Sequence, residues 1–236
     1  ESSNQGGKVV SAGQKDGDVV VSGPVLKIVE PTVQPKFIQK ESLEFTKVIQ
    51  KNDRILFVGD GMTQQMYYTR AFASGVMGIK PRSNLRVFNG GKESATAESA
   101  AQWVDDLIKY AKPTVVFVCF GLNDGGFDAP NKATTEKYEK SLAALATKIK
   151  SHQGVRQIVL LSSPAIQTGS VADENRGGYN RTLYELALAT QRVAKSQDVG
   201  FVDLFEPMRV ANTEAAKLGG SMLTIGGKLP NEEGHT

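Results

Sequence analysis

The chain has 236 residues, of which 40% are hydrophobic and 22% are charged, an ordinary composition for a folded domain. Its formal net charge of +3 is small and its lysines are dispersed, so nucleic-acid binding has no support. No apolar run approaches the ~20 residues that a membrane-spanning helix needs. The single Cys119 excludes an internal disulfide, and no His/Cys cluster has metal-site spacing, so we expect neither a metal nor another cofactor.

The N-terminal part of the chain differs from the rest. Residues 1–17 are rich in Gly, Ser, Lys and Asp, which predicts a flexible arm. Residues 18–40 are rich in valine and isoleucine but are interrupted by prolines, which suits edge strands or an extended strap rather than a central strand. We therefore divide the chain into an N-terminal arm, residues 1–42, and a domain, residues 43–236.

Two interpretations of the arm stay open. It packs as a strap on its own domain, or it docks on a neighbouring subunit by strand addition. Because the expected sheet is complete without it, we favour self-association or a protein partner. The chain opens at Glu1 and shows no signal peptide, which suits a mature secreted or periplasmic protein.

The rest of the chain alternates apolar runs with amphipathic stretches. The runs predict buried parallel strands near residues 54–59, 84–89, 114–120, 156–162 and 199–204. Apolar residues at helical spacing predict helices between them, over 97–108, 138–149 and 179–193. This alternation gives an α/β fold, a three-layer α/β/α sandwich around a five-stranded, mostly parallel sheet.

The first of these strands ends in the most informative residues of the chain. Residues 57–64 read Phe-Val-Gly-Asp-Gly-Met-Thr-Gln, so an apolar run ends abruptly in a Gly-Asp turn. Three more segments follow in order: Val-Phe-Asn-Gly-Gly-Lys-Glu-Ser-Ala-Thr at 87–96, a strand ending in Gly-Leu-Asn-Asp at 116–124, and Gly-Gly-Lys-Leu-Pro-Asn-Glu-Glu-Gly-His at 226–235. Together they resemble the SGNH (GDSL-type) hydrolase family over most of residues 53–235. The resemblance implies a flavodoxin-like strand order.

The resemblance also implies a role for each matching position. Gly61 stands where the family has its nucleophilic serine, and Gly226 and Leu229 stand at the positions of the triad's acid and base. A serine is a poor nucleophile without an imidazole base that a carboxylate orients. The residues at the expected pocket and oxyanion-like positions are Asp60, Gly61, Gly91, Ser94, Asn123 and Asp124.

Two functions remain open at this point. The substituted triad favours a catalytically degenerate protein that binds a carbohydrate or acylated ligand, or serves in an assembly. The alternative is an active esterase that acts on acyl esters or carbohydrate acetyl esters through non-standard residues. Its candidates are Thr63 and Ser94 as nucleophiles, and Glu232 with His235, whose acid-x-x-base spacing is shifted by three residues.

Overall fold

A computed structural model of the chain describes residues 48–167, 178–217, 223–225 and 229–230. All of them belong to one compact unit, Pro31–Thr236. The whole predicted arm, residues 1–42, lies outside the described residues, as do Gly226, Glu232 and His235.

The domain is built around a five-stranded sheet in which every pairing is parallel. Its strands are β1 (Arg54–Gly59), β2 (Arg86–Gly91), β3 (Val115–Cys119), β4 (Gln157–Leu161) and β5 (Gly200–Val202). Their order is β2-β1-β3-β4-β5, which confirms the predicted α/β class and the flavodoxin-like order. The prediction placed β2 two residues too early, because Gly90 and Gly91 continue the ladder opposite Val58 and Gly59.

Seven helices are present in the described part of the chain: α2 (Gly61–Gln64), α3 (Tyr67–Ile79), α4 (Ala97–Ala100), α5 (Val104–Ala111), α6 (Lys132–Lys150), α8 (Tyr179–Ser196) and α9 (Phe205–Lys217). A two-stranded antiparallel hairpin follows them, formed by β6 (Thr224–Ile225) and β7 (Leu229–Pro230). Among the described helices, none is both long and apolar enough to cross a membrane. The single helix predicted over 97–108 is instead α4 and α5, because Trp103 leaves helical geometry (φ −126, ψ −8) between them.

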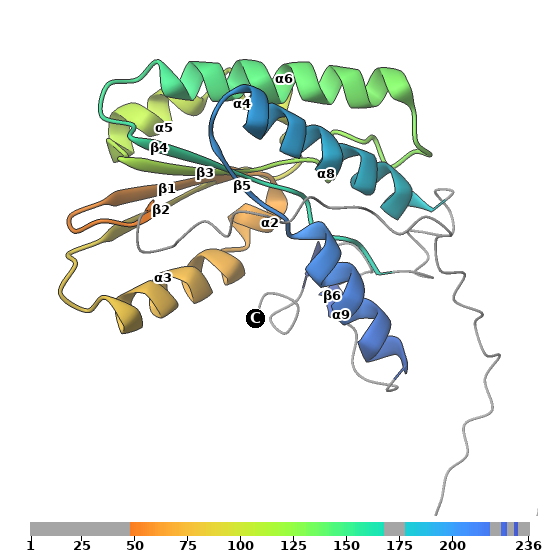
Figure 1. Cartoon of the computed structure of the whole chain (residues 1–236), viewed down its shortest axis with the longest axis horizontal. Coiled ribbons are helices and arrows are strands. Elements are labelled where there is room, and N and C mark those ends of the chain that lie inside the picture. Colours follow the sequence, from red (N-terminus) through yellow and green to blue (C-terminus); the bar gives the residue numbers. More distant parts are fainter. Residues whose placement is uncertain (1–47, 168–177, 218–222, 226–228, 231–236) are drawn as a thin grey trace, which may run out of the picture. The chain divides into compact units, whose positions relative to one another are not determined.

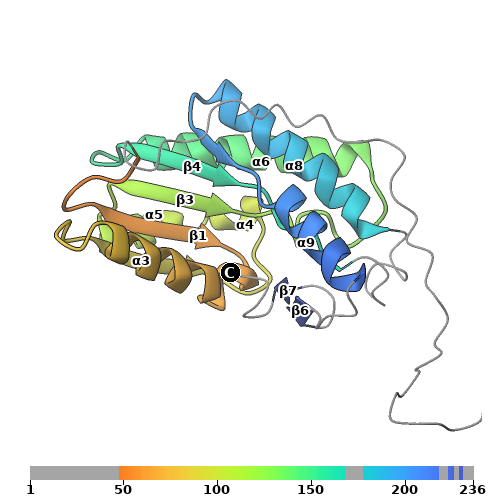
Figure 2. The same cartoon turned by 60° about the horizontal axis from the view of Figure 1, so that its bottom comes forward.

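The helices cover the two faces of the sheet unevenly (Figure 1 and Figure 2). One face, here called the four-helix face, packs its apolar side chains against α4, α5, α6 and α8. On the opposite face, here called the α3 face, Phe72 of α3 contacts the rings of Phe57 and Phe117. The chain moves from β1 to β2 toward one edge of the sheet, whereas the connections from β2 to β3, from β3 to β4 and from β4 to β5 move toward the other edge. Because all of these crossovers are right-handed, the helices of the first connection lie on one face and those of the later connections lie on the opposite face.

Candidate functional site

Asp60 forms the turn between β1 and α2. Its Oδ1 accepts a hydrogen bond from the Met62 N–H at 3.0 Å, so the side chain caps α2. The residue is 1% exposed, and within the described part of the chain its Oδ2 has no hydrogen-bond partner. Burial, assisted by the charge of Asp124, raises the pKa of Asp60 to about 7. The carboxyl group is therefore partly protonated at neutral pH.

Gly61 is the first residue of α2 and lies half-buried at the carboxyl edge of the sheet. It is not one of the glycines with positive φ, so its backbone suits any residue. The atoms nearest to a Cβ built at Gly61 would be Cα and Cγ of Glu93, both at 3.8 Å, which is ordinary van der Waals contact. The fold therefore has room for a side chain at position 61, which the resemblance predicted to be the nucleophile position.

Gly91 contrasts with Gly61, because it lies against the backbone of α2. A Cβ at Gly91 would lie 2.1 Å from the Gln64 nitrogen and 2.5 Å from the Thr63 carbonyl carbon. Asn89 links α2 to the end of β2 by two hydrogen bonds. Its Nδ2 donates to the Thr63 carbonyl at 2.6 Å, and its Oδ1 accepts from the Gly91 N–H at 3.0 Å. These contacts hold α2 against the end of β2, so the turn that carries Gly61 has a defined position.

The two candidate nucleophiles occupy different surroundings. Thr63 is 0% exposed, and its Oγ1 lies 2.8 Å from the Tyr68 hydroxyl. A Cβ at Gly59 would lie 2.0 Å from that Oγ1, so the Thr63 hydroxyl packs closely against the last residue of β1. Ser94 is exposed in the turn after β2 and has a left-handed backbone with φ of 58°. Of the two hydroxyls, only that of Ser94 is open to solvent.

Asp124 and Asn123 join the end of β3 to the segment that follows β2. The Asp124 carboxylate accepts hydrogen bonds from the Gly121 N–H at 3.0 Å and from the Ala97 N–H at 2.9 Å. Desolvation nevertheless raises the pKa of Asp124 to about 6. The half-buried Asn123 donates from Nδ2 to the Ala95 carbonyl at 3.1 Å. Both residues therefore hold the turn in which Ser94 lies.

The strand order explains why these residues meet. Because β1 lies between β2 and β3, the carboxyl ends of the three strands are neighbours. The structure thus collects on one edge the predicted residues Asp60, Gly61, Gly91, Ser94, Asn123 and Asp124. Leu229 lies in β7. The other acid and base candidates, Gly226, Glu232 and His235, lie outside the described residues.

Sequence reasoning missed two residues of this site. Glu93 is the nearest neighbour of a side chain at position 61, and Tyr68 holds the Thr63 hydroxyl. Glu93 could have been predicted from its position next to Ser94, whereas nothing in the sequence indicates a contact between Tyr68 and Thr63. Within the described ranges, no group of three or more His, Cys, Asp or Glu side chains has a metal-binding arrangement.

The sequence profile of the GDSL-like Lipase/Acylhydrolase family matches residues 57–236. The chain belongs to this family. No match was found among curated proteins.

Two enzymes are among the solved structures that resemble this GDSL-like chain. The acetylxylan esterase Axe2 from Geobacillus stearothermophilus matches with a TM-score of 0.62 and 23% identity, over 80% of this chain and 91% of that chain. A gut microbial diltiazem-metabolizing enzyme matches with a TM-score of 0.65 and 24% identity, over 79% of this chain. The match covers only 45% of that enzyme, so this chain spans less than half of its length. At these identities the likeness establishes the fold alone.

Asn123→Ala tests whether the GDSL-like site is ordered by its own hydrogen bonds. We expect the substitution to lower the free energy of unfolding by about 1 kcal/mol, because it removes the bond to the Ala95 carbonyl from a half-buried side chain. Urea unfolding of both proteins measures the effect. Equal midpoints would show that Asn123 contributes nothing to the order of this edge.

Proposed function

We propose that this GDSL-like protein binds an ester-bearing ligand at the carboxyl edge of its sheet and does not hydrolyse it through a serine nucleophile. The observation that carries the proposal is Gly61, a half-buried glycine at the first position of α2 with free space around it. The surrounding turns are intact, held by Asp60, Asn89 and Asp124. The architecture of the site is thus retained while the attacking group is absent.

Packing supplies no reason for the glycine. The backbone at Gly61 is not left-handed, and a Cβ there would have its nearest neighbours at 3.8 Å. A serine would therefore fit, which argues that its absence concerns chemistry rather than folding. Without a triad, the remaining oxyanion stabilisation and binding are worth only ~10³–10⁴-fold over water in protease systems.

The ligand class we propose is an acetylated or acylated carbohydrate. Its support is the likeness to Axe2, which is an acetylxylan esterase. Acetylated xylo-oligosaccharides are therefore the first ligands to test, and their deacetylated forms are the matched controls. Self-association through the arm and a secreted or periplasmic location are also part of this proposal.

One observation favours a second candidate function, ester hydrolysis by non-standard residues. The Glu93 side chain lies beside the vacant position at Gly61, with Cγ 3.8 Å from a Cβ built there. A carboxylate in that place is suited to take a proton from an attacking water. Ser94, the next residue, offers an exposed hydroxyl. Both features keep an active esterase in consideration.

We expect the purified chain to release no more nitrophenol from short-chain nitrophenyl esters, and no more acetate from acetylated xylo-oligosaccharides, than a heat-denatured control. The reason is the glycine at position 61, which cannot attack a carbonyl carbon. Calorimetric titration should at the same time detect binding of acetylated but not deacetylated oligosaccharides.

Turnover above the control would contradict the proposal if it were abolished by Ser94→Ala, Thr63→Ala, Glu93→Gln or His235→Ala. The particular variant that loses activity would identify the working group. Turnover that none of these variants affects would point to a contaminating esterase, and a fluorophosphonate probe would then reveal whether this chain carries any activated nucleophile.

A further inference from the structure

The fold distributes the charges of the chain unevenly. All pairings in the sheet are parallel, so the amino ends of the strands lie together, opposite the edge that carries the candidate site (Figure 1 and Figure 2). This end of the domain is here called the amino end. Three short segments lead into β1, β2 and β3 there: residues 51–54, 80–86 and 109–114. Their cations are Lys51, Arg54, Lys80, Arg82, Arg86, Lys109 and Lys112, and their single acid is Asp53.

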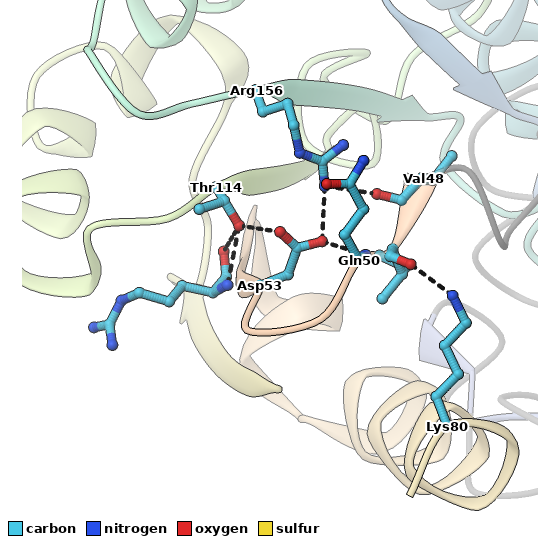
Figure 3. A network of polar contacts seen from close by, with 8 residues as sticks. Val48, Gln50, Asp53, Lys80, Thr114 and Arg156 are labelled. Atoms are coloured by element: carbon cyan, nitrogen blue, oxygen red, sulfur yellow. Dashed lines mark hydrogen bonds and ion pairs between the residues drawn. The ribbon is translucent and has the colours of Figure 1, made fainter. Parts of the chain in front are cut away.

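Asp53 does not neutralise the exposed cations, because its bonds are made inside the domain (Figure 3). It is buried, and its Oδ2 accepts a hydrogen bond from Arg156 Nη2 at 2.7 Å. Arg156, the residue before β4, also donates from Nη2 to the Val48 carbonyl at 2.9 Å. Lys80 is used internally as well, since its Nζ donates to the Ile49 carbonyl at 2.6 Å. Asp53 and Arg156 thus form a neutral pair, and the other cations keep their charge.

The turns before β1 and β2 are bonded to each other and carry two of these cations. The Asn52 N–H donates to the Ser83 carbonyl at 2.7 Å, and Asn84 Nδ2 donates to Asn52 Oδ1 at 3.0 Å. These bonds bring together Lys51 and Arg82, which directly precede Asn52 and Ser83. Both cationic side chains are exposed, and neither has an ion-pair partner among the described residues.

Two more cations begin neighbouring strands. Arg54 and Arg86 are in register at the start of β1 and β2, on strands that lie ~4.8 Å apart. The Arg54 guanidinium lies over the Phe88 ring, 4.8 Å from its centroid, and its Nε donates to the Ala111 carbonyl at 2.6 Å. Arg86 is exposed and has no ion-pair partner in the described part of the chain. Like charges so close repel, and an anion outside the domain would relieve that repulsion.

Apolar side chains flank these cations on both sides of the sheet. The two most exposed large apolar side chains of the described residues are Tyr110, at 78%, and Ile79, at 71%. Ile79 is the last residue of α3, so it lies next to the turn before β2. Tyr110 is near the end of α5 on the four-helix face, where its ring contacts Phe88. The amino end therefore combines unpaired cations with protruding apolar groups.

We propose that the amino end docks the domain peripherally on a lipid bilayer that contains anionic lipids. Lys51, Arg82 and Arg86 would meet the lipid head groups, whose negative surface potential attracts basic residues. Ile79 and Tyr110 would enter the interfacial layer, where apolar side chains are buried and tyrosine is enriched.

A bilayer explains both features of the amino end, whereas a soluble polyanion would use only the cations. The contact is peripheral and requires no membrane-spanning helix. It also goes beyond the proposed ligand binding, because it uses the opposite end of the domain. In the docked orientation the carboxyl edge, with Gly61, faces away from the lipid and stays open to a ligand.

Co-sedimentation of the full-length chain with vesicles tests the proposal. We expect binding to phosphatidylcholine vesicles that contain phosphatidylserine and none to vesicles of phosphatidylcholine alone. Arg82→Gln with Arg86→Gln should weaken binding about 25-fold, since each Lys or Arg near an anionic surface contributes about fivefold. The matched control is Lys132→Gln with Lys137→Gln, which removes the same charge from exposed residues at the start of α6, beyond the carboxyl end of β3.

No binding to the phosphatidylserine vesicles would overturn the proposal, and so would an equal effect, or no effect, of the two double variants. Ile79→Ser with Tyr110→Ser should weaken binding to vesicles several-fold but leave binding to dextran sulfate unaltered. Vesicle binding that these two changes do not affect would overturn the bilayer as the partner. Dextran sulfate bound as tightly as the vesicles would overturn it as well, and would identify a soluble polyanion instead.

A fluorescent label reports the orientation directly. Cys119 is buried, so under native conditions an environment-sensitive label attaches only to a thiol introduced by Ile79→Cys or, as the control, by Lys137→Cys. We expect the emission of the label at position 79 to rise and shift to the blue on phosphatidylserine vesicles, and that of the label at position 137 to stay unchanged. Equal changes at both positions, or a change at position 137 alone, would overturn the proposal.

Discussion

Asp60→Asn should stabilise the domain by about 2–4 kcal/mol at pH 8, and this gain should vanish near pH 4. The folded state raises the pKa of Asp60 from 3.8 to about 7, chiefly by burial. Between these two pH values the unfolded chain releases a proton that the folded chain retains, so the stability of the wild type falls as pH rises. Asparagine keeps the oxygen that caps α2 at the Met62 N–H but cannot ionise.

Urea unfolding at pH 4, 6 and 8 measures this difference. The charge of Asp124 contributes to the raised pKa of Asp60, so Asp124→Asn is the matched background. In that background the gain from Asp60→Asn at pH 8 should be smaller, because one cause of the shift is gone. The pKa of Asp60 would not be raised by burial if the variant were no more stable than the wild type at pH 8, or if its gain in stability persisted unchanged at pH 4.

Gly91→Ala should cost about 3 kcal/mol or more, enough to loosen the site as a whole. The added methyl group would lie 2.1 Å from the Gln64 nitrogen and 2.5 Å from the Thr63 carbonyl carbon. Both atoms are backbone, so α2 would have to move away from β2 as a unit. The same movement would break the bond from Asn89 Nδ2 to the Thr63 carbonyl at 2.6 Å.

Gly61→Ala is the matched control, because it adds the same methyl group to the first residue of α2, where there is space for it. The nearest atoms to that methyl group are at 3.8 Å, and alanine is the better helix former by ~1 kcal/mol. We expect this variant to be at least as stable as the wild type in thermal and urea unfolding. Equal losses in the two variants would mean that position 61 is as crowded as position 91.

The contrast between the two glycines bears directly on function. Gly91 is required by the close approach of two backbones, whereas Gly61 is not required by any contact of the described residues. On our proposal Gly61 stands at the family's nucleophile position, and no contact of the described residues then explains why a serine is absent from it. This is why we propose ligand binding rather than serine-dependent hydrolysis.

Local patterns in the sequence were sufficient to predict the strands of the sheet, whereas the strand order and the candidate site positions came from the resemblance to the SGNH family. The residues of the apolar runs at 54–59 and 114–120 were enough to predict buried parallel strands, and β1 and β3 confirm these predictions. The Gly-Asp turn after the first run likewise placed Asp60 at the carboxyl edge, whereas Asn123 was identified through the resemblance to the family. Such predictions succeed because strand burial and turn formation depend on neighbours within a few residues.

Contacts between distant segments decided the rest. In the sequence Gly61 and Gly91 are equivalent glycines after strands, and only the packing of α2 on β2 makes one of them indispensable. The raised pKa of Asp60 needs burial by the whole fold and a charge contributed from the end of β3. The anchor of Val48 by Arg156 joins residues 108 positions apart. Since these effects arise from atoms that the folding of the chain brings together, no local pattern could have predicted them.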